Sequence, residues 1–274
     1  MRGVASCLLG SFTEPRVEHG HAVDRYVEIG SLTKALTGTV LTRLAAAGVL
    51  DPDEPVERVL PTVPAGTGIT PRRLMTHTSG LPRLPPGISL RDPYRSFTDE
   101  ALAALLPRLD RLLARPAGGE AEYSNFGYAL LGAVLVAATG QGYEELLRER
   151  VLEPLGVTEV TSRPDPAERL VGRGLLGRDR RPWTMDGAIL PAGGLWATPR
   201  AAAALLTGLV VERELGAPAP SWQRNGRVTW HNGATGDASV LAAATDDGRW
   251  VLLHRLGAHR RTDRDGMRAL REAA

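Results

Sequence analysis

Lysine is nearly missing from this chain of 274 residues: of 33 cationic residues, only Lys34 is a lysine, and all the others are arginine. Arginine serves as well as lysine for solubility and surface pairing, but its guanidinium stays protonated at any pH that a protein survives. An amine loses its proton when it is desolvated or placed near another cation. Lys34 is therefore a candidate base, and the alternative is chance in an arginine-biased genome.

Cysteine is almost absent as well, and Cys7 alone excludes an internal disulfide and a cysteine metal cluster. Nothing in this composition demands an oxidising compartment. The first ten residues run into Glu14 and Arg16 too soon to form the apolar core of a secretory signal. We therefore expect a cytoplasmic protein, although a secreted chain whose leader has been removed would look the same.

Long apolar runs are also missing. The longest, about residues 128–140, is too short to cross a bilayer and predicts a buried helix, so no membrane span is expected. The formal net charge is only +2, which excludes an electrostatic nucleic-acid binder. No G-x-S-x-G elbow occurs, and Gly172–Gly177 fits a dinucleotide-binding pattern without a strand before it or a helix after it.

The composition present, 43% hydrophobic and 23% charged residues, is ordinary for a globular enzyme. The first twenty residues are predicted to form strands, with the strongest signal in residues 4–12. In the last third, strands are predicted in residues 227–231, 238–243 and 249–256. Between them the spacing of apolar residues, the caps and the breakers predict helices, and residues 157–190 look like loop. The expected helices cover residues 30–48, 70–77, 98 onward with a kink at Pro107, 126–139, 143–152, 198–210 and 262 onward.

This order of elements predicts an α+β fold. An antiparallel sheet formed by both chain ends would be flanked by helices and joined to a helical insertion. We expect one catalytic unit of two lobes, a sheet lobe of residues 1–62 plus 183–274 and a mainly helical lobe of residues 63–182, with a cleft between them.

Ser31 and Lys34 are three residues apart, so on a helix their side chains share a face and can meet. This spacing supplies a nucleophile and a base. To act as a base near neutral pH, the lysine pKa must fall by around three units from about 10.4, which corresponds to about 4 kcal/mol. The S-x-x-K pattern also occurs by chance in many chains.

A second group is Tyr123-Ser124-Asn125. A phenol near a lysine ammonium ionises more easily and can shuttle a proton, and the asparagine amide can hold a substrate carbonyl. The structural alternative is that Tyr123 is an aromatic residue at a helix start and that Asn125 is its N-cap.

A third group is His231-Asn232-Gly233-Ala234, in the late strand region, where glycine lets a strand edge approach a ligand closely. Alternatively, His231 simply ends a strand. His77 is expected to be a buried structural histidine. His19 and His21 lack nearby ligand partners, so no metal site is predicted.

Together, Ser-x-x-Lys, Tyr-x-Asn and His-x-Gly in this order resemble the serine β-lactamase-like superfamily. The likeness is greatest to its branch of class C β-lactamases, DD-peptidases, D-aminopeptidases and family VIII esterases. Further segments across the chain agree with this resemblance: Leu74–Leu81, Tyr123–Tyr128, Glu153–Gly156 and Ala192–Leu195.

The resemblance implies a β-lactamase/transpeptidase-like fold and a role for each motif residue. Ser31 would attack an acyl carbonyl, and Lys34 would accept or relay its proton. Tyr123 would protonate the leaving group and later help to activate water or an alcohol. Asn125 would position the substrate, and no cofactor is implied.

At the third motif, His231 and Gly233 would contact the substrate, and the backbone N–H groups of Ser31 and Ala234 would form an oxyanion hole. His231 stands where most β-lactamases have a lysine. The fixed cation that would bind a β-lactam carboxylate is therefore lost, which argues against a dedicated β-lactamase.

The implied function is that of a serine hydrolase that forms an acyl-enzyme on Ser31 and cleaves a small ester or amide. Two alternatives use the same residue: an acyltransferase in small-molecule biosynthesis, and a β-lactam-binding sensor with slow deacylation. The sequence does not predict the substrate identity or the oligomeric state.

Overall fold

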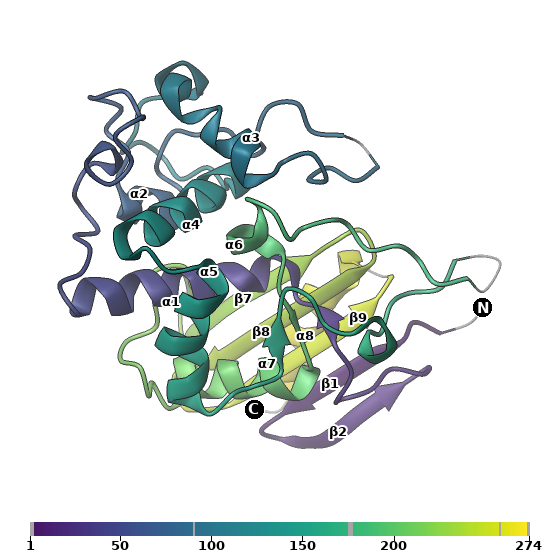
Figure 1. Cartoon of the computed structure of the whole chain (residues 1–274). Helices are drawn as coiled ribbons and strands as arrows, with labels where there is room; N and C mark the ends of the chain where they lie inside the picture. The colour runs from purple at the N-terminus through teal and green to yellow at the C-terminus, as the bar shows by residue number, and fades with distance from the viewer. Residues whose placement is uncertain (1–2, 90, 175–177, 258, 273–274) are drawn as a thin grey trace.

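A computed structural model describes residues 3–89, 91–174, 178–257 and 259–272. Its centre is a six-stranded antiparallel sheet with the strand order β2-β1-β9-β8-β7-β6 (Figure 1). These strands are β1 (Ser6–Gly10), β2 (Thr13–Glu18), β6 (Gln223–Asn225), β7 (Val228–Ala234), β8 (Ala238–Thr245) and β9 (Trp250–Leu256). Because β1 pairs with β9, with Cys7 opposite His254, both chain ends form one sheet, as predicted.

The two faces of the sheet are covered by different helices. In β8, Leu241 and Ala243 point to one face, where they pack with Leu270 of α8 (His259–Glu272). The alternate residues of β8 point to the main core, where α7 (Pro199–Leu206) packs. This alternation follows from the two-residue period of a strand.

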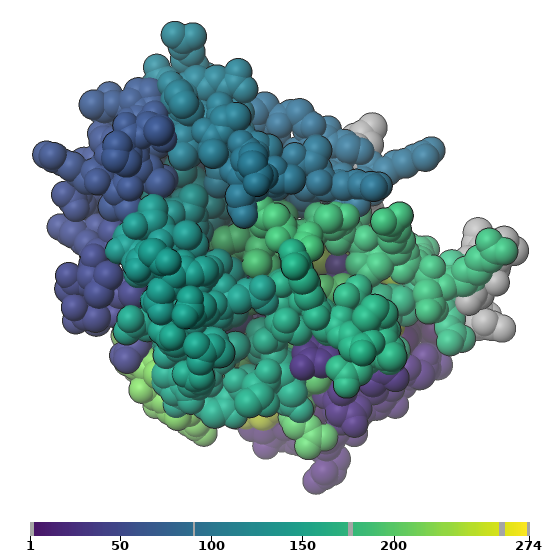
Figure 2. All heavy atoms as spheres, in the orientation of Figure 1, coloured from purple at the N-terminus to yellow at the C-terminus, as the bar shows by residue number. Residues whose placement is uncertain are grey.

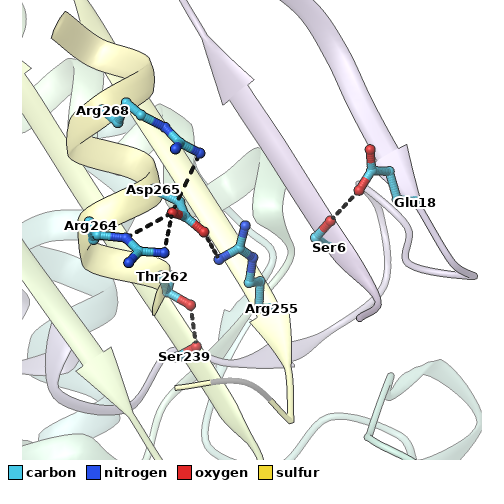
Figure 3. Close-up of polar contacts among 8 residues, drawn as sticks. All are labelled: Ser6, Glu18, Ser239, Arg255, Thr262, Arg264, Asp265 and Arg268. Carbon is cyan, nitrogen blue, oxygen red and sulfur yellow. Dashed lines mark hydrogen bonds and ion pairs between the residues drawn. The ribbon is translucent and has the colours of Figure 1, made fainter. Parts of the chain in front are cut away.

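Figure 3 shows how polar contacts fasten α8 to the sheet. Ser239 of β8 and Thr262 of α8 share a buried hydrogen bond of 2.7 Å between their hydroxyl oxygens. Asp265 accepts a 2.7 Å bond from Arg255 of β9 and also contacts Arg264 and Arg268 (Figure 3). The closing helix is therefore held by both apolar and charged contacts.

The helices between the two parts of the sheet follow the predicted order. Thr70, Thr98 and Thr198 cap α2, α3 and α7 with their side-chain oxygens, and proline follows Thr70 and Thr198. The α-helices not yet given are α1 (Thr33–Ala46), α2 (Pro71–Met75), α3 (Asp99–Ala103), α4 (Asn125–Thr139), α5 (Tyr143–Leu147) and α6 (Leu190–Gly193). The 3₁₀ turns are η1 (Gly30–Leu32), η2 (Val56–Arg58), η3 (Leu106–Leu112), η5 (Glu153–Leu155) and η6 (Pro166–Glu168), and the π-helical turns are η4 (Arg148–Leu152) and η7 (Thr207–Val211).

A small second sheet has the order β3-β5-β4, and its first strand lies just before Ser31 in the chain. Its strands are β3 (Val27–Glu28), β4 (Val160–Thr161) and β5 (Trp196–Ala197). They escaped prediction, as did β6, because two or three residues are too few to show an alternating pattern. The predicted helix over residues 30–48 also begins differently, since η1 precedes α1.

In the space-filling view, the surface is hollowed along the boundary between the blue and teal helical segments and the green segments below them (Figure 2). No helix in the described parts of the chain has both the length and the apolarity needed to cross a membrane. Residues 175–177 of the Gly172–Gly177 pattern lie outside the described residues.

Candidate active site

Ser31 lies in η1, directly against the end of β7, and two glycines permit this approach. Gly30 has a φ of +50°, and a Cβ atom there would lie 2.8 Å from the amide nitrogen of Ala234. A Cβ atom at Gly233 would lie 2.0 Å from the carbonyl oxygen of Ile29. Because side chains at either position would push η1 away, glycine sets the distance between Ser31 and β7.

The Ser31 hydroxyl receives two hydrogen bonds. Lys34 Nζ donates to Ser31 Oγ at 3.1 Å, and Tyr123 OH donates to the same oxygen at 2.5 Å. Lys34 Nζ also donates to the carbonyl oxygen of Ala192 in α6. Ser31 in η1 thus receives hydrogen bonds from Lys34 in α1 and from Tyr123 just before α4, so two groups that can carry a proton meet at one nucleophilic oxygen.

The Lys34 side chain is fully buried, with 0% of its surface exposed. Burial lowers its pKa well below the usual value, and the positive charge of Arg83 lowers that pKa further. Its Nζ atom lies 4.8 Å from the ring centroid of Tyr123 and 5.3 Å from that of Tyr128. A lysine with a lowered pKa can be neutral and accept a proton from a serine hydroxyl.

Tyr123 differs from the expectation that a nearby lysine ammonium would ease its ionisation. Burial raises the pKa of its phenol, and this outweighs the lowering by the Ser31 hydrogen bond and by Arg83. The phenol therefore stays protonated and donates to Ser31. Such a group is suited to giving a proton to a leaving group.

His77 supports this tyrosine from behind. Its ring centroid lies 4.7 Å from that of Tyr123 and 5.1 Å from that of Tyr128, and its Nδ1 accepts the backbone N–H of Ser124 at 3.1 Å. Burial lowers the pKa of His77 to about 3. The imidazole is thus neutral, in agreement with the structural role expected for it.

Asn125 does not cap the helix that it begins. Ser124 does so, by accepting the N–H of Gly127 at 2.8 Å. The Asn125 amide nitrogen instead donates to the hydroxyl of Tyr94 at 2.8 Å. Its Oδ1 atom is buried without a hydrogen-bond partner among the described residues, and Asn125 lines the cleft. It therefore presents an acceptor for a ligand.

The structure does not bring His231 into the cleft lining. The side chain is 2% exposed, its ring meets that of Trp222 edge-on at 6.3 Å, and its Nδ1–H donates to the carbonyl oxygen of Asn232 at 2.6 Å. Strand alternation explains this, because Trp230 and Asn232 face the cleft while His231 points beneath it. Burial lowers the pKa of His231 to about 4, so the ring is neutral.

The backbone at the end of β7 faces Ser31. Thr235 N–H donates to the carbonyl oxygen of Ala238 at 2.9 Å, toward β8. Successive N–H groups of a strand point to opposite edges, so the Ala234 N–H points away from β8 and toward η1. This direction suits the predicted pair of oxyanion donors from Ser31 and Ala234, whose role stays a prediction.

A cleft of about 580 Å³ opens over Ser31. Loop residues that the sequence did not single out form much of its wall, since nothing in their local pattern differs from an ordinary surface loop. The cleft is lined by Ser31, Arg83, Leu84, Pro93, Tyr94, Tyr123, Asn125, Trp183, Met185, Ala192, Gly193, Gln223, Trp230, Asn232, Gly233, Ala234 and Thr235. In the described parts of the chain, no three His, Cys, Asp or Glu side chains gather closely enough to hold a metal ion.

Comparison with known proteins agrees with this arrangement. The family model described as beta-lactamase matches residues 16–251. The D-alanyl-D-alanine-carboxypeptidase/endopeptidase AmpH of Escherichia coli K12 is 34% identical over 184 residues, covering 65% of this chain and 47% of that protein. The chain thus spans about half the length of this relative.

Two solved structures share the fold at low sequence identity. The octameric penicillin-binding protein homologue of Pyrococcus abyssi has a TM-score of 0.80 and 20% identity, over 98% of this chain and 72% of the other. The D-amino acid amidase of Ochrobactrum anthropi SV3 has a TM-score of 0.72 and 23% identity, over 92% and 85%. These likenesses confirm the β-lactamase/transpeptidase-like fold that the motifs predicted.

Proposed function

This chain belongs to the beta-lactamase family, and from this premise we propose that it is a serine hydrolase that forms an acyl-enzyme on Ser31. The observation that carries the proposal is the pair of donors on one oxygen: Lys34 Nζ at 3.1 Å and Tyr123 OH at 2.5 Å from Ser31 Oγ. Both groups lie beside a cleft large enough for a small molecule.

In the first half of the reaction, neutral Lys34 takes the proton of Ser31 while Oγ attacks the substrate carbonyl. The negative charge that develops on the carbonyl oxygen is stabilised by the N–H groups of Ser31 and Ala234. Removing one such donor typically costs about 10²–10³ in rate. As the carbonyl bond to the leaving group breaks, Tyr123 gives its proton to the departing alcohol or amine and is reprotonated by Lys34.

In the second half, water replaces the leaving group. Tyr123 takes a proton from water as the water oxygen attacks the acyl carbon, and it passes its own proton to neutral Lys34. Ser31 Oγ then leaves, regains that proton from Lys34, and the carboxylic acid is released. Ser31, Lys34 and Tyr123 thereby return to their starting protonation states, and no cofactor is needed.

A small amide or ester is the proposed substrate. The names of two similar proteins, a D-alanyl-D-alanine carboxypeptidase/endopeptidase and a D-amino acid amidase, favour amides of D-amino acids as the first compounds to test. The unpartnered Oδ1 of Asn125 supports this choice, because an amide N–H offers it a donor that an ester lacks.

A panel of D-amino acid 4-nitroanilides, chromogenic esters and nitrocefin tests the proposal. The wild type should turn over at least one compound, and Ser31→Ala should lose at least about 10³-fold of that activity. Ser11→Ala is the matched control, because Ser11 is exposed in the β1–β2 hairpin. Turnover that persists in Ser31→Ala would overturn the proposal.

The same panel separates hydrolysis from its two alternatives. If the protein is an acyltransferase, added amines or alcohols should yield new amides or esters beside the carboxylic acid. Hydrolysis alone in every case rejects acyl transfer. A stable adduct on Ser31 after a β-lactam, with no turnover of any ester or amide, indicates a sensor.

A further inference from the structure

Arg83 is the one charged residue among the described residues that line the cleft. We propose that Arg83 is a specificity-determining residue that binds a carboxylate of the substrate, so that the enzyme acts on anionic esters or amides in preference to neutral ones. This inference rests on the proposed function, whose substrate class it narrows.

The backbone of Arg83 is fixed to the start of α4. Its carbonyl oxygen accepts the N–H of Asn125 at 2.9 Å, and the preceding carbonyl, that of Pro82, accepts the Ser124 hydroxyl at 2.7 Å. Tyr123 lies directly before Ser124, at this same helix start. Arg83 is therefore held in register with the residues proposed to carry the reaction.

The guanidinium group of Arg83 lies over the ring of Tyr123. Its central carbon is 5.0 Å from the ring centroid of Tyr123, close enough for a cation–π contact. The charge also lowers the pKa of Lys34, and opposes the rise in pKa that burial causes at Tyr123 and Tyr94. The charge of Arg83 therefore acts on Lys34 and Tyr123, the two groups that donate hydrogen bonds to Ser31.

Within the described chain, no carboxylate forms an ion pair with Arg83. Several surface arginines do have a carboxylate partner, as Arg72 has Asp53 at 2.7 Å and Arg115 has Glu122 at 2.7 Å. Arg83 differs from other arginines without such a partner in that it lines the cleft. An arginine that lacks a counter-charge in a cleft attracts an anion, and its planar fork matches a carboxylate with two parallel hydrogen bonds.

Among the described residues that line the cleft, none besides Arg83 carries a charge. His231 is buried and neutral, so the third motif supplies no cation. The walls combine uncharged polar side chains with aromatic ones. Tyr94 and Trp183 meet edge-on at 6.4 Å between ring centroids, and Trp230 also lines the cleft. These surfaces suit an apolar part of the same molecule, while Arg83 holds its carboxylate.

Matched pairs of esters test this inference. The 4-nitrophenyl hydrogen ester of adipic acid carries a carboxylate on the acyl side, and its methyl-capped analogue is neutral. 3-Carboxyphenyl butyrate and phenyl butyrate place the same difference on the leaving group. In at least one of the two pairs, we expect kcat/KM for the anionic ester to exceed that for its neutral partner by about tenfold or more at low salt. This ratio should fall as the salt concentration rises.

Three variants assign the preference to Arg83. Arg83→Gln should bring the ratio of anionic to neutral kcat/KM close to one, Arg83→Lys should keep most of it, and Arg83→Glu should reverse it toward a cationic ester. Arg95→Gln is the matched control, because Arg95 is exposed in the same segment and does not line the cleft.

The two proposals fail in different ways. Ser31-dependent hydrolysis with equal rates for anionic and neutral esters, in wild type and Arg83→Gln alike, would overturn this inference and leave the hydrolase intact. If no compound shows Ser31-dependent turnover, the hydrolase proposal fails. In that case calorimetry still tests the role of Arg83, by measuring how the carboxylate esters bind to the Ser31→Ala protein and to the Ser31→Ala/Arg83→Gln protein. Loss of binding in the double variant supports carboxylate binding by Arg83, and unchanged binding overturns it.

Discussion

Lys34 combines full burial with contacts to Ser31 and to the carbonyl of Ala192. Its chemistry depends on an amine that can lose a proton, which a guanidinium cannot do. We expect Lys34→Arg to lose at least about 10²-fold of kcat/KM, the typical contribution of a positioned base. Ester hydrolysis together with thermal unfolding measures the effect.

Because a larger side chain at a fully buried position can disturb folding, Lys34→Met provides a second test. It is close to lysine in length and carries no charge. A stable Lys34→Met protein with no acylation separates lost chemistry from lost structure. Near-full activity in either variant would mean that the single lysine is an accident of composition.

Glu28 is a second buried charge, 7% exposed, and it accepts a hydrogen bond from Thr235 at 2.9 Å. Burial raises its pKa to about 7, Asp237 adds to the rise, and Thr235 and Arg169 oppose it. A carboxyl whose folded pKa is raised contributes stability below its unfolded pKa, near 4.3, and loses it as pH rises through about 7.

Glu28→Gln keeps the size and a polar end while removing this titration. Relative to wild type, its unfolding free energy should be nearly equal at pH 4.5 and greater by up to about 3 kcal/mol at pH 8. Urea unfolding at the two pH values measures this difference. An equal difference at both would show that Glu28 does not titrate in this range.

The residues that meet at the cleft were only partly predictable. Spacing indicated Ser31 with Lys34, and the motif order indicated Tyr123 and Asn125. The side of β7 to which His231 points was not predictable, because a shift of one residue along a strand moves each side chain to the opposite face. Arg83 and Tyr94 come from loops whose position depends on the whole fold.

At the scale of elements, the contact between η1 and β7 determines where Ser31 lies relative to Ala234. Gly233→Ala places a methyl group against the carbonyl of Ile29. We expect a loss of about 1–3 kcal/mol in unfolding free energy and at least about a tenfold loss in kcat, because the Ala234 N–H moves away from Ser31.

Gly142→Ala is the control for that change. Gly142 precedes α5 with an ordinary φ of −66°, and no atom lies within 4 Å of an added Cβ. Chemical unfolding and ester kinetics on both variants make the comparison. Equal stability and equal activity of the two alanine variants would show that the close approach of η1 to β7 does not position Ser31.

The elements themselves were largely predictable, because their signals are local. Thr-Pro at residues 70–71 and 198–199 marks two helix starts, and Gly140 ends α4 with a φ of +71°. The small sheet and η1 were not predictable. Their conformations depend on partners far away in the sequence, as β3 depends on β5.

At the scale of the whole molecule, a chain of histidine contacts joins the two ends. Ala22 N–H donates to His21 Nδ1 at 2.8 Å, which leaves His21 Nε2–H to donate to His254 Nδ1 at 2.8 Å. His254 Nε2–H then donates to the carbonyl of Glu28 at 3.2 Å. A further proton on His254 Nδ1 would put its N–H opposite the N–H of His21 Nε2.

Burial lowers the pKa of both histidines, that of His254 to about 3. Their folded pKa values lie below the unfolded value of about 6.5, so they remove stability as pH falls below 6.5. Each such group contributes up to about 1.4 kcal/mol per pH unit to this loss. His254→Gln should therefore flatten the fall in unfolding free energy between pH 6.5 and 4. An unchanged slope would contradict this.

The α+β plan with a sheet from both termini was predictable, because strand signals gather at the two ends. The division into a sheet lobe and a helical lobe at residues 62 and 183 stays a prediction, as does the cytoplasmic location. β4 lies in the segment assigned to the helical lobe yet pairs with β5 of the other segment. That pairing is non-local and leaves no local pattern.

The most direct test of the central claim is the mass of the peptide that contains Ser31 after treatment with a fluorophosphonate. Trypsin cleaves after Arg25 and Lys34, so residues 26–34 form one peptide. We predict a single phosphonyl adduct on Ser31 in this peptide, absent in Ser31→Ala. In Lys34→Met trypsin next cleaves after Arg43, and the adduct on the resulting peptide of residues 26–43 should form at least about 10²-fold more slowly. An adduct on another serine, or none at all, would contradict the acyl-enzyme account.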